Sequence, residues 1–302
     1  MATIGLASAG LAIWMTRTPR RPSPTAGPTA LAGGIGIGLA VVIPDYRPLL
    51  AVVRLPVLLA GAPFGWPRQV SIGDFFTLFF PWPVVNQIVL IIGGLLWWGT
   101  AVSYHRRSRG ACLACGSAPS SPSARSAATV ATWGRRAVTL AILVPLLYSL
   151  TRWCWALGIP LGVTSEGLRS EAAESPGIWL AGAALGVMAS GGAVLTLGLV
   201  QRWGEVYPRW IPGLRGKPVR PRTAIIPATL VTILLTSAGL MYDRWWVLGR
   251  FHLTADNWGL YLPEMIWPLW GAGLAVATFA YHVRRRSPCS RCVVRASRPH
   301  PG

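Results

Sequence analysis

Long apolar segments constrain the fold of this chain more than any other feature of its sequence. A helix that crosses the ~30 Å hydrocarbon core of a bilayer needs roughly 17–25 mostly apolar residues. Six segments have about this length and composition, and a shorter seventh candidate precedes them at 2–15. The six are 28–43, 84–104, 136–158, 177–201, 224–242 and 262–283. We therefore predict an all-α, polytopic transmembrane helical bundle of six to seven spans.

The composition supports this prediction. Charged residues make up 12% of the chain and hydrophobic residues 52%, and there are 16 Trp among 302 residues. Soluble domains carry about twice that share of charged residues. The chain is therefore expected to reside in a membrane.

The net charge of +19 first raises the question of a nucleic-acid partner. Most of the 28 Lys and Arg lie in four segments, 16–27, 105–136, 202–222 and 284–302, which are all predicted to fall on one side of the bilayer. Basic loops mark the cytoplasmic side, so the carboxyl terminus is predicted to be cytoplasmic. No helix-turn-helix or finger spacing accompanies the charge, and we expect anionic lipid headgroups as partners and no nucleic acid.

A short motif occurs twice at an offset of 177 residues, each time where an apolar segment gives way to basic sequence. The first copy comprises Tyr104, His105, Arg107, Arg109, Cys112 and Cys115, and the second comprises Tyr281, His282, Arg284, Arg286, Cys289 and Cys292. Both copies follow a span that descends to the same face, which predicts two parallel internal repeats. We expect the first repeat over 1–115, a Ser- and Pro-rich flexible linker over 116–135, the second repeat over 136–292, and a disordered tail over 293–302.

The two Cys-x-x-Cys pairs offer four thiolates on one predicted face. Four thiolates form the ligand set of a closed, tetrahedral zinc site, with Zn–S bonds of about 2.3 Å. We therefore predict zinc bound by Cys112, Cys115, Cys289 and Cys292. Neighbouring arginines are expected to favour thiol deprotonation. Unmetallated thiols, a disulfide-exchanging pair and an iron–sulfur cluster remain as alternatives.

The Tyr-His pairs at 104–105 and 281–282 have two interpretations. They form a proton-sensitive pair or reserve metal ligands, or they are amphipathic side chains at the level of the headgroups.

Ionisable residues also border apolar sequence on the predicted outer face. Arg152, Asp243 and Glu264 lie among several Trp residues, and such groups are costly in a bilayer unless they pair or line a cavity. They indicate a binding site for a small amphiphile. The alternative is a snorkelling Arg, helix-end acids and an aromatic belt.

The stretch 201–221 interleaves basic and Trp residues, as is typical of a segment lying along headgroups. Within it, Trp203-Gly204-Glu205-Val206-Tyr207-Pro208-Arg209-Trp210-Ile211-Pro212-Gly213, together with Trp155-Ala156-Leu157-Gly158 upstream, resembles a recurring pattern in uncharacterised multi-pass membrane proteins of high-GC Gram-positive bacteria. The resemblance covers mainly 150–245 and does not include the thiol pairs. It implies a helical bundle in a bacterial inner membrane and carries over no catalytic residue.

Two classes of function follow. In the first, the protein is non-enzymatic, and a cytoplasmic zinc site joins its halves in support of small-molecule binding or transport. In the second, it is a membrane thiol redox protein or a redox or zinc sensor. No nucleophile-elbow, zinc-protease, nucleotide-binding or phosphate-loop motif is present, and a zinc with four thiolates is a poor catalyst, so an enzyme is the weaker expectation.

Overall fold

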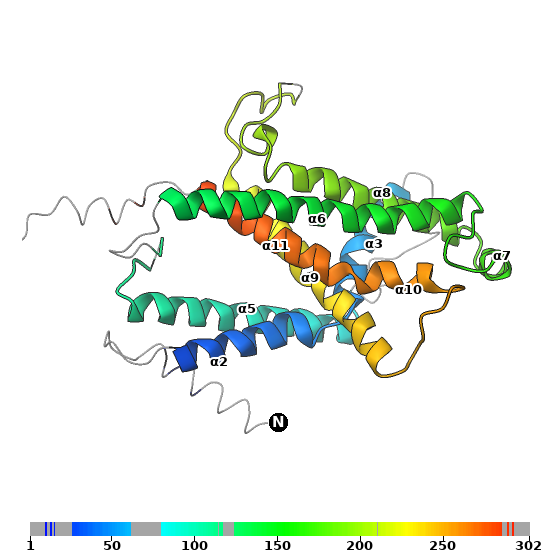
Figure 1. Ribbon diagram of the computed structural model, residues 1–302, viewed down its shortest axis with the longest axis horizontal. Coiled ribbons are helices and arrows are strands. Elements are labelled where there is room, and N and C mark those ends of the chain that lie inside the picture. The colour runs from blue at the N-terminus through cyan, green and yellow to red at the C-terminus, as the bar shows by residue number, and fades with distance from the viewer. Residues whose placement is uncertain are drawn as a thin grey trace, which may run out of the picture. The chain divides into compact units, whose positions relative to one another are not determined.

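The computed structural model describes residues 26–61, 80–113, 115–116, 124–209 and 211–285, together with the single positions 10, 13, 15, 289 and 292. These residues are overwhelmingly helical (Figure 1). Within them, extended pairing is limited to an isolated antiparallel bridge between Val206 and Pro218. The predicted all-α class is therefore confirmed. Most of the segment 2–15 and all of the tail 293–302 lie outside the described residues.

The chain divides into two compact units. Unit 1 comprises 1–43, 88–127 and 286–302, and unit 2 comprises 44–87 and 128–285. Both Cys-x-x-Cys pairs belong to unit 1, although the second pair comes almost at the end of the chain.

Unit 1 contains α2 (Ala26–Ile37), the π-helical turn η1 (Gly38–Val42) and most of α5 (Trp82–Ser108). The helices meet at glycines. A Cβ on Gly94 of α5 would stand 2.6 Å from the backbone oxygen of Gly36 and from the backbone nitrogen of Ala40. Only glycine permits this approach of two helical backbones. A small core of Met15, Ala32, Ala101 and Tyr104 accompanies the contact.

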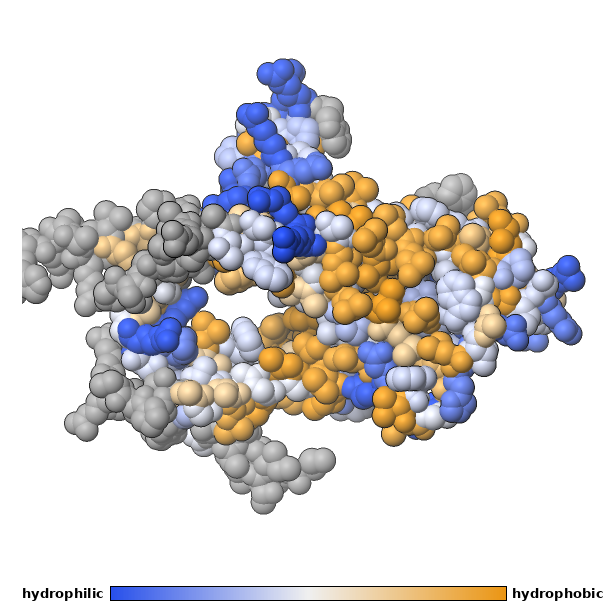
Figure 2. Space-filling view, in the orientation of Figure 1, coloured by the Kyte–Doolittle hydropathy of each residue, from blue (hydrophilic) through white to orange (hydrophobic). Residues whose placement is uncertain are grey.

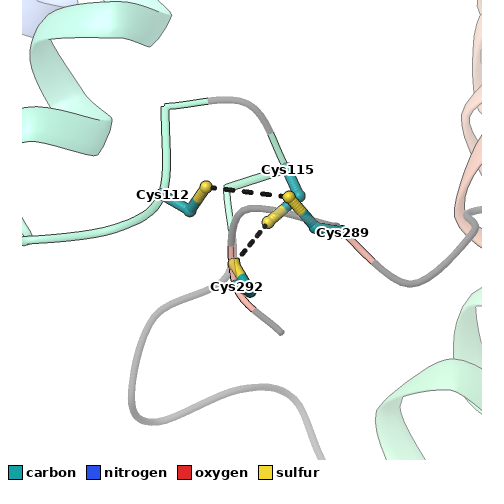
Figure 3. A group of neighbouring side chains, drawn as sticks. All are labelled: Cys112, Cys115, Cys289 and Cys292. Atoms are coloured by element: carbon teal, nitrogen blue, oxygen red, sulfur yellow. Dashed lines mark hydrogen bonds between the residues drawn. The ribbon is translucent and has the colours of Figure 1, made fainter. Parts of the chain in front are cut away.

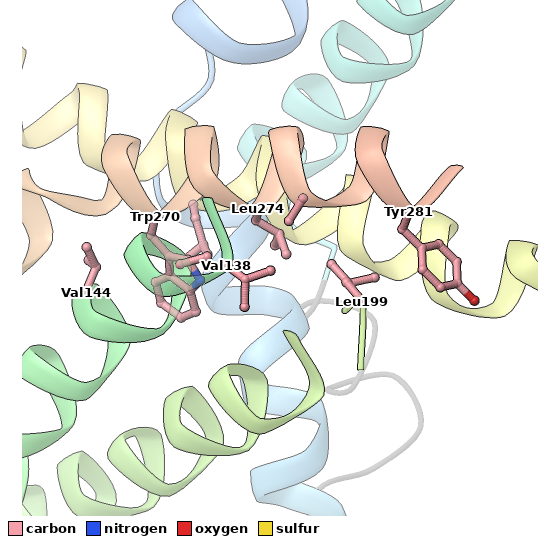
Figure 4. Packing of buried hydrophobic residues seen from close by; sticks show 9 residues of the cluster. Val138, Val144, Leu199, Trp270, Leu274 and Tyr281 are labelled. Carbon is pink, nitrogen blue, oxygen red and sulfur yellow. The ribbon is translucent and has the colours of Figure 1, made fainter. Parts of the chain in front are cut away.

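Unit 2 contains the remaining helices. They are α3 (Arg47–Gly61), α6 (Ala124–Ala156, from residue 128), α7 (Ser165–Glu174), α8 (Ile178–Leu197), the 3₁₀ turn η3 (Arg202–Gly204), α9 (Pro221–Val247), α10 (Trp258–Met265) and α11 (Trp267–Arg284). Helix α11 packs along α9, and side chains of α6 close the other side of the same core. Figure 4 shows Trp270, Leu274 and Tyr281 of α11 pointing into this core, with Val138 and Val144 from α6.

Four helices are long and apolar enough to span a membrane. They are Trp82–Ser108, Thr129–Ala156, Ile178–Leu197 and Pro221–Val247. A fifth candidate is the pair Ala26–Val42 and Arg47–Arg54, which is bent by 55°. These elements overlap five of the six predicted segments. Six to seven spans and an internal repeat stay predictions.

The outward faces of these helices are apolar. Leu180, Val187 and Leu195 of α8 are among the large hydrophobic side chains exposed on the surface. Apolar side chains cover much of the face of the molecule seen in Figure 2. Such a surface is costly in water and suits lipid.

Two predicted segments differ in detail from the helices. Helix α6 begins at Ala124, within the stretch 116–135 that we expected as a linker, because Ala-Arg-Ser-Ala-Ala is a strong helix-forming sequence. The segment 262–283 forms two helices that meet at Ile266. Pro268 lacks a backbone N–H, so it fits the first turn of a new helix and interrupts a continuous one.

Candidate metal centre

The structure brings the sulfurs of the two Cys-x-x-Cys pairs together within unit 1. The Sγ atoms of Cys112, Cys115, Cys289 and Cys292 all lie within 4.8 Å of one another (Figure 3). Cys112 Sγ lies 4.0 Å from Cys289 Sγ, and Cys115 Sγ lies 3.4 Å from Cys292 Sγ. Each of these two close pairs joins residues separated by the motif offset of 177. None of the chain's five cysteines, all of which are described, forms a disulfide.

These distances fit a four-coordinate metal ion. In a tetrahedral site with metal–sulfur bonds of about 2.3 Å, the sulfur atoms lie ~3.8 Å from one another. This value falls between the 3.4 Å and 4.0 Å of the two close pairs. The donor set consists of four soft sulfurs, which suits zinc, iron and other thiophilic metals and not the oxygen-seeking Mg²⁺ or Ca²⁺. The four cysteines could therefore hold one metal ion with small side-chain adjustments.

The end of α5 positions the first pair. The Gly110 N–H donates to Arg107 O and the Ala111 N–H donates to Arg106 O, at 3.1 and 2.9 Å, and Gly110 has φ +64°. These two hydrogen bonds together form a Schellman motif, which ends the helix and turns the chain back. Cys112 follows directly, so the helix end fixes where its thiol begins.

A tight turn then presents both thiols of the first pair. The Gly116 N–H donates to Cys112 O at 2.7 Å, and Gly116 has φ +75°, a conformation that favours glycine. The Arg106 guanidinium donates to Leu113 O at 2.8 Å, which ties the turn to α5. In the second pair, the Cys292 N–H donates to Cys289 O at 2.9 Å.

Without a cation, the neighbouring thiols oppose the ionisation of Cys292. The hydrogen bond with the Cys115 thiol, followed by that with Cys112, raises the pKa of Cys292 to about 12. A bound metal ion would reverse this effect, because it stabilises thiolates directly. Metal uptake at neutral pH must therefore release protons.

The basic residues next to the thiols have separate contacts. Arg284 pairs with Glu205 at 3.0 Å and donates to Leu199 O, and Arg285 donates to Val219 O at 2.9 Å. Both are thus engaged with the segment after α8 in unit 2. Arg106 donates to Leu113 O of the thiol turn itself, whereas Arg286 lies outside the described residues.

The Tyr-His pairs divide in the same way in both motif copies. Tyr104 and Tyr281 are buried, and His105 and His282 are exposed. The Tyr281 hydroxyl donates to Gly204 O at 2.7 Å. The tyrosines therefore serve as core residues of their units.

Two of the three residues of the predicted outer-face site come together in unit 2. Arg152 of α6 and Glu264 of α10 form a buried ion pair. The Arg152 guanidinium also lies over the rings of Tyr148 and Trp155, 4.7 and 4.3 Å from their centroids. Asp243, near the end of α9, is not part of this pair. Sequence reasoning missed Tyr148 as a partner of Arg152, although the spacing of four residues on a helix places the two side chains on one face.

The segment 201–221 forms a hairpin-like excursion from unit 2. The Tyr207 N–H donates to Lys217 O at 3.0 Å and the Val219 N–H donates to Glu205 O at 2.9 Å. Its basic side chains, among them Arg209, Arg215 and Lys217, are exposed. The predicted basic surface therefore exists, and its contact with headgroups stays a prediction.

Comparison of the chain with protein-family models, with curated proteins and with solved structures found no significant match.

Proposed function

We propose that this is a non-enzymatic multi-pass membrane protein in which a zinc ion, held by four thiolates on the cytoplasmic side, joins the two halves of the chain. The single observation that carries the proposal is the gathering of all four sulfurs within 4.8 Å, although the two pairs stand 177 residues apart in sequence. Zinc is the metal that most often takes four thiolates in a purely structural site.

The cytoplasmic location is supported by charge. The basic segments that flank both thiol pairs belong on the cytoplasmic face under the positive-inside rule. A reducing compartment also keeps the thiols available for metal. The resemblance over 150–245 supports a bacterial inner membrane.

An internal duplication is supported by matched burial at the motif offset. Gly94, Ala101 and Tyr104 of α5 are buried, and so are Gly271, Thr278 and Tyr281 at the equivalent positions of α11. At Gly94 of α5 and at Gly271 of α11, a neighbouring helix lies so close that an added Cβ would clash with it. This matched burial supports a duplicated helix pair within a bundle of six or seven spans.

In this proposal the zinc has a supporting role. It fixes the ends of the halves on one side of the bilayer, and the small-molecule binding or transport site lies on the other side, near Arg152 and Glu264. The exposed basic hairpin would rest on anionic headgroups.

Metal analysis tests the proposal directly. Protein purified in detergent under reducing conditions should hold one zinc per chain. Cys112→Ser and Cys292→Ser should each abolish tight zinc binding, and Cys154→Ser, which changes a thiol outside the cluster, should retain it. A wild-type protein that holds no metal after equilibration with zinc would overturn the proposal.

Thiol redox exchange is the second candidate function, favoured by the 3.4 Å between Cys115 Sγ and Cys292 Sγ. Approach to about 2.05 Å would form a disulfide, with two electrons and two protons passing to a disulfide-bearing partner. A Cys115–Cys292 disulfide that a thioredoxin-like protein reduces would favour this function over the zinc site.

A further inference from the structure

The connection between α8 and α9 presents positive charge that nothing described in unit 2 balances. Within residues 201–221, which we call the basic hairpin, the chain has five basic residues and one acid, Glu205. This acid pairs with Arg284 of α11 at 3.0 Å, so it is not available to the hairpin's own cations. The five cations are all exposed, and none joins an ion pair among the described residues: Arg202, Arg209, Arg215, Lys217 and Arg220.

The basic hairpin is held in place by its neighbours in unit 2. The Tyr281 hydroxyl donates to Gly204 O at 2.7 Å, and the Arg285 guanidinium donates to Val219 O at 2.9 Å. The Trp203 ring packs on the end of α8, because a Cβ added to Gly198 would lie 2.7 Å from it. A ligand of the hairpin therefore meets a surface that is already ordered, which lowers the entropic cost of binding.

Helix α8 meets the basic hairpin with an apolar surface. It is the least buried of the four long apolar helices, and exposed side chains extend along its whole length, with Leu180 75%, Val187 61% and Leu195 69% exposed. In Figure 1 the hairpin leaves the end of α8 and projects across the direction of the helix, and Figure 2 shows a hydrophilic projection there, beside the apolar surface. We call this junction the α8 corner. One of its arms is apolar and the other is cationic.

The two arms of the α8 corner match the two parts of a lipid molecule. An α-helix of 20 residues is ~30 Å long, so α8 has the length of the hydrocarbon core, and acyl chains can lie along its exposed side chains. Arg202 follows the last residue of α8 by five positions, which places the hairpin at the level of the headgroups. Basic groups at this level attract anionic headgroups, whereas a zwitterionic headgroup has no net charge to attract. A soluble anion would use the cationic arm alone.

We propose that the α8 corner is a binding site for an anionic phospholipid of the cytoplasmic leaflet, with the acyl chains along α8 and the phosphate at the cations of the basic hairpin. The inference rests on the proposed membrane location and orientation of the chain. It adds a specific ligand at a defined place to the general contact with headgroups. The thiol cluster, which belongs to unit 1, takes no part in it.

Native mass spectrometry of the full-length protein in detergent tests the ligand. The probe is an equimolar mixture of phosphatidylglycerol and phosphatidylcholine with identical acyl chains. We expect the wild-type protein to retain mainly phosphatidylglycerol, and we expect glycerol phosphate, which has no acyl chains, not to displace it. Equal retention of both lipids would overturn the proposal. Displacement by glycerol phosphate would overturn it in favour of a soluble anion, and a lipid-free dimer would assign the face of α8 to a second copy of the chain.

Single charge removals test the place of binding. Arg202→Gln and Arg209→Gln should each lower the preference for phosphatidylglycerol by about fivefold, as expected for a basic residue near an anionic surface. Arg169→Gln is the matched control, because Arg169 is equally exposed but lies on α7, which precedes the other end of α8. An equal loss in the control would refute the location. If a variant fails to fold, the comparison of lipids on the wild-type protein still decides on the ligand.

The same spectra separate this inference from the proposed zinc site, because the mass of each species shows its metal content. Bound zinc with no preference between the two lipids would overturn the lipid site alone. A preference for phosphatidylglycerol in a protein that holds no zinc would overturn the zinc site alone. We expect both ligands on the wild-type protein, and unchanged zinc in Arg202→Gln and Arg209→Gln.

Discussion

The two units bury their helices by different means. In unit 1, backbones approach at Gly36 and Gly94, and the described core is small, with Met15, Ala32, Ala101 and Tyr104. Unit 2 has a core of nine buried residues from several helices, and a buried ion pair flanked by aromatic rings. Among helices in a bilayer, side-chain packing and interhelical hydrogen bonds provide most of the stability, because lipid tails are as apolar as the side chains. Unit 1 therefore has more need of a cross-link than unit 2, and its thiol cluster provides four ligands for one.

The largest expected effect comes from the metal. Removing zinc with a chelator, or changing Cys112→Ser, should lower the stability of unit 1 by several kcal/mol, because binding of a structural zinc contributes about 10 kcal/mol or more in small domains. Hydrogen exchange should show loss of protection at the end of α5 and no change in α9 and α11. Cys154→Ser is the control. Equal loss in both units would contradict the contrast drawn between them.

The next effect concerns the ion pair of unit 2. Glu264→Leu leaves Arg152 buried without its partner, and breaking a buried pair in this way costs about 3–5 kcal/mol. The control is Glu205→Leu, because Glu205 and Arg284 are each about one-third exposed and such pairs contribute about 1 kcal/mol or less. Chemical denaturation of detergent-solubilised protein gives both values, and similar losses for the two variants would rule out a special role for the buried pair.

The helix contact of unit 1 gives a smaller effect. Gly94→Ala places a Cβ 2.6 Å from two backbone atoms, so the helices must separate, at an expected cost of about 1–3 kcal/mol. Gly99→Ala, on the same helix with no atom within 4 Å, should be neutral or stabilising by up to about 1 kcal/mol. Gly271→Ala should cost less than Gly94→Ala, because its closest neighbour is the side-chain hydroxyl of Thr236. Thermal unfolding of the three variants measures the order.

The smallest effect is expected at the end of α11. Tyr281→Phe removes one hydrogen bond to Gly204 O from the core of unit 2 and keeps the ring, so a loss of about 1 kcal/mol is expected. The change should not alter the zinc content, because Tyr281 belongs to unit 2. Loss of zinc in this variant would show that the thiol cluster depends on packing in unit 2.

Much of the helical structure follows from apolar length alone. The predicted segments 84–104 and 224–242 lie inside α5 and α9, because an unbroken apolar run has no competing structure in a bilayer. Helix α3 escaped prediction, because Arg54 and two prolines, Pro48 and Pro56, conceal its apolar character. The break at Ile266 follows from Pro268. A prediction from the length of an apolar segment misses this break, because it takes no account of the effect of proline on the helix.

The candidate sites were predictable to different degrees. The thiol pairs carry their spacing in the sequence, and Gly116 after the second thiol is a local signal for the turn. The pairing of Arg152 with Glu264 joins residues 112 positions apart, and nothing local distinguishes Glu264 from Asp243 as its partner.

The make-up of unit 1 has a consequence for biosynthesis. Cys289 and Cys292 leave the ribosome 177 residues after their counterparts, which is roughly 10–35 s at typical rates of translation. During this interval Cys112 and Cys115 form half of a site and are exposed to oxidants and to competing metals. For the four thiols to bind a metal ion as proposed, Cys112 and Cys115 must therefore stay reduced until the second pair emerges.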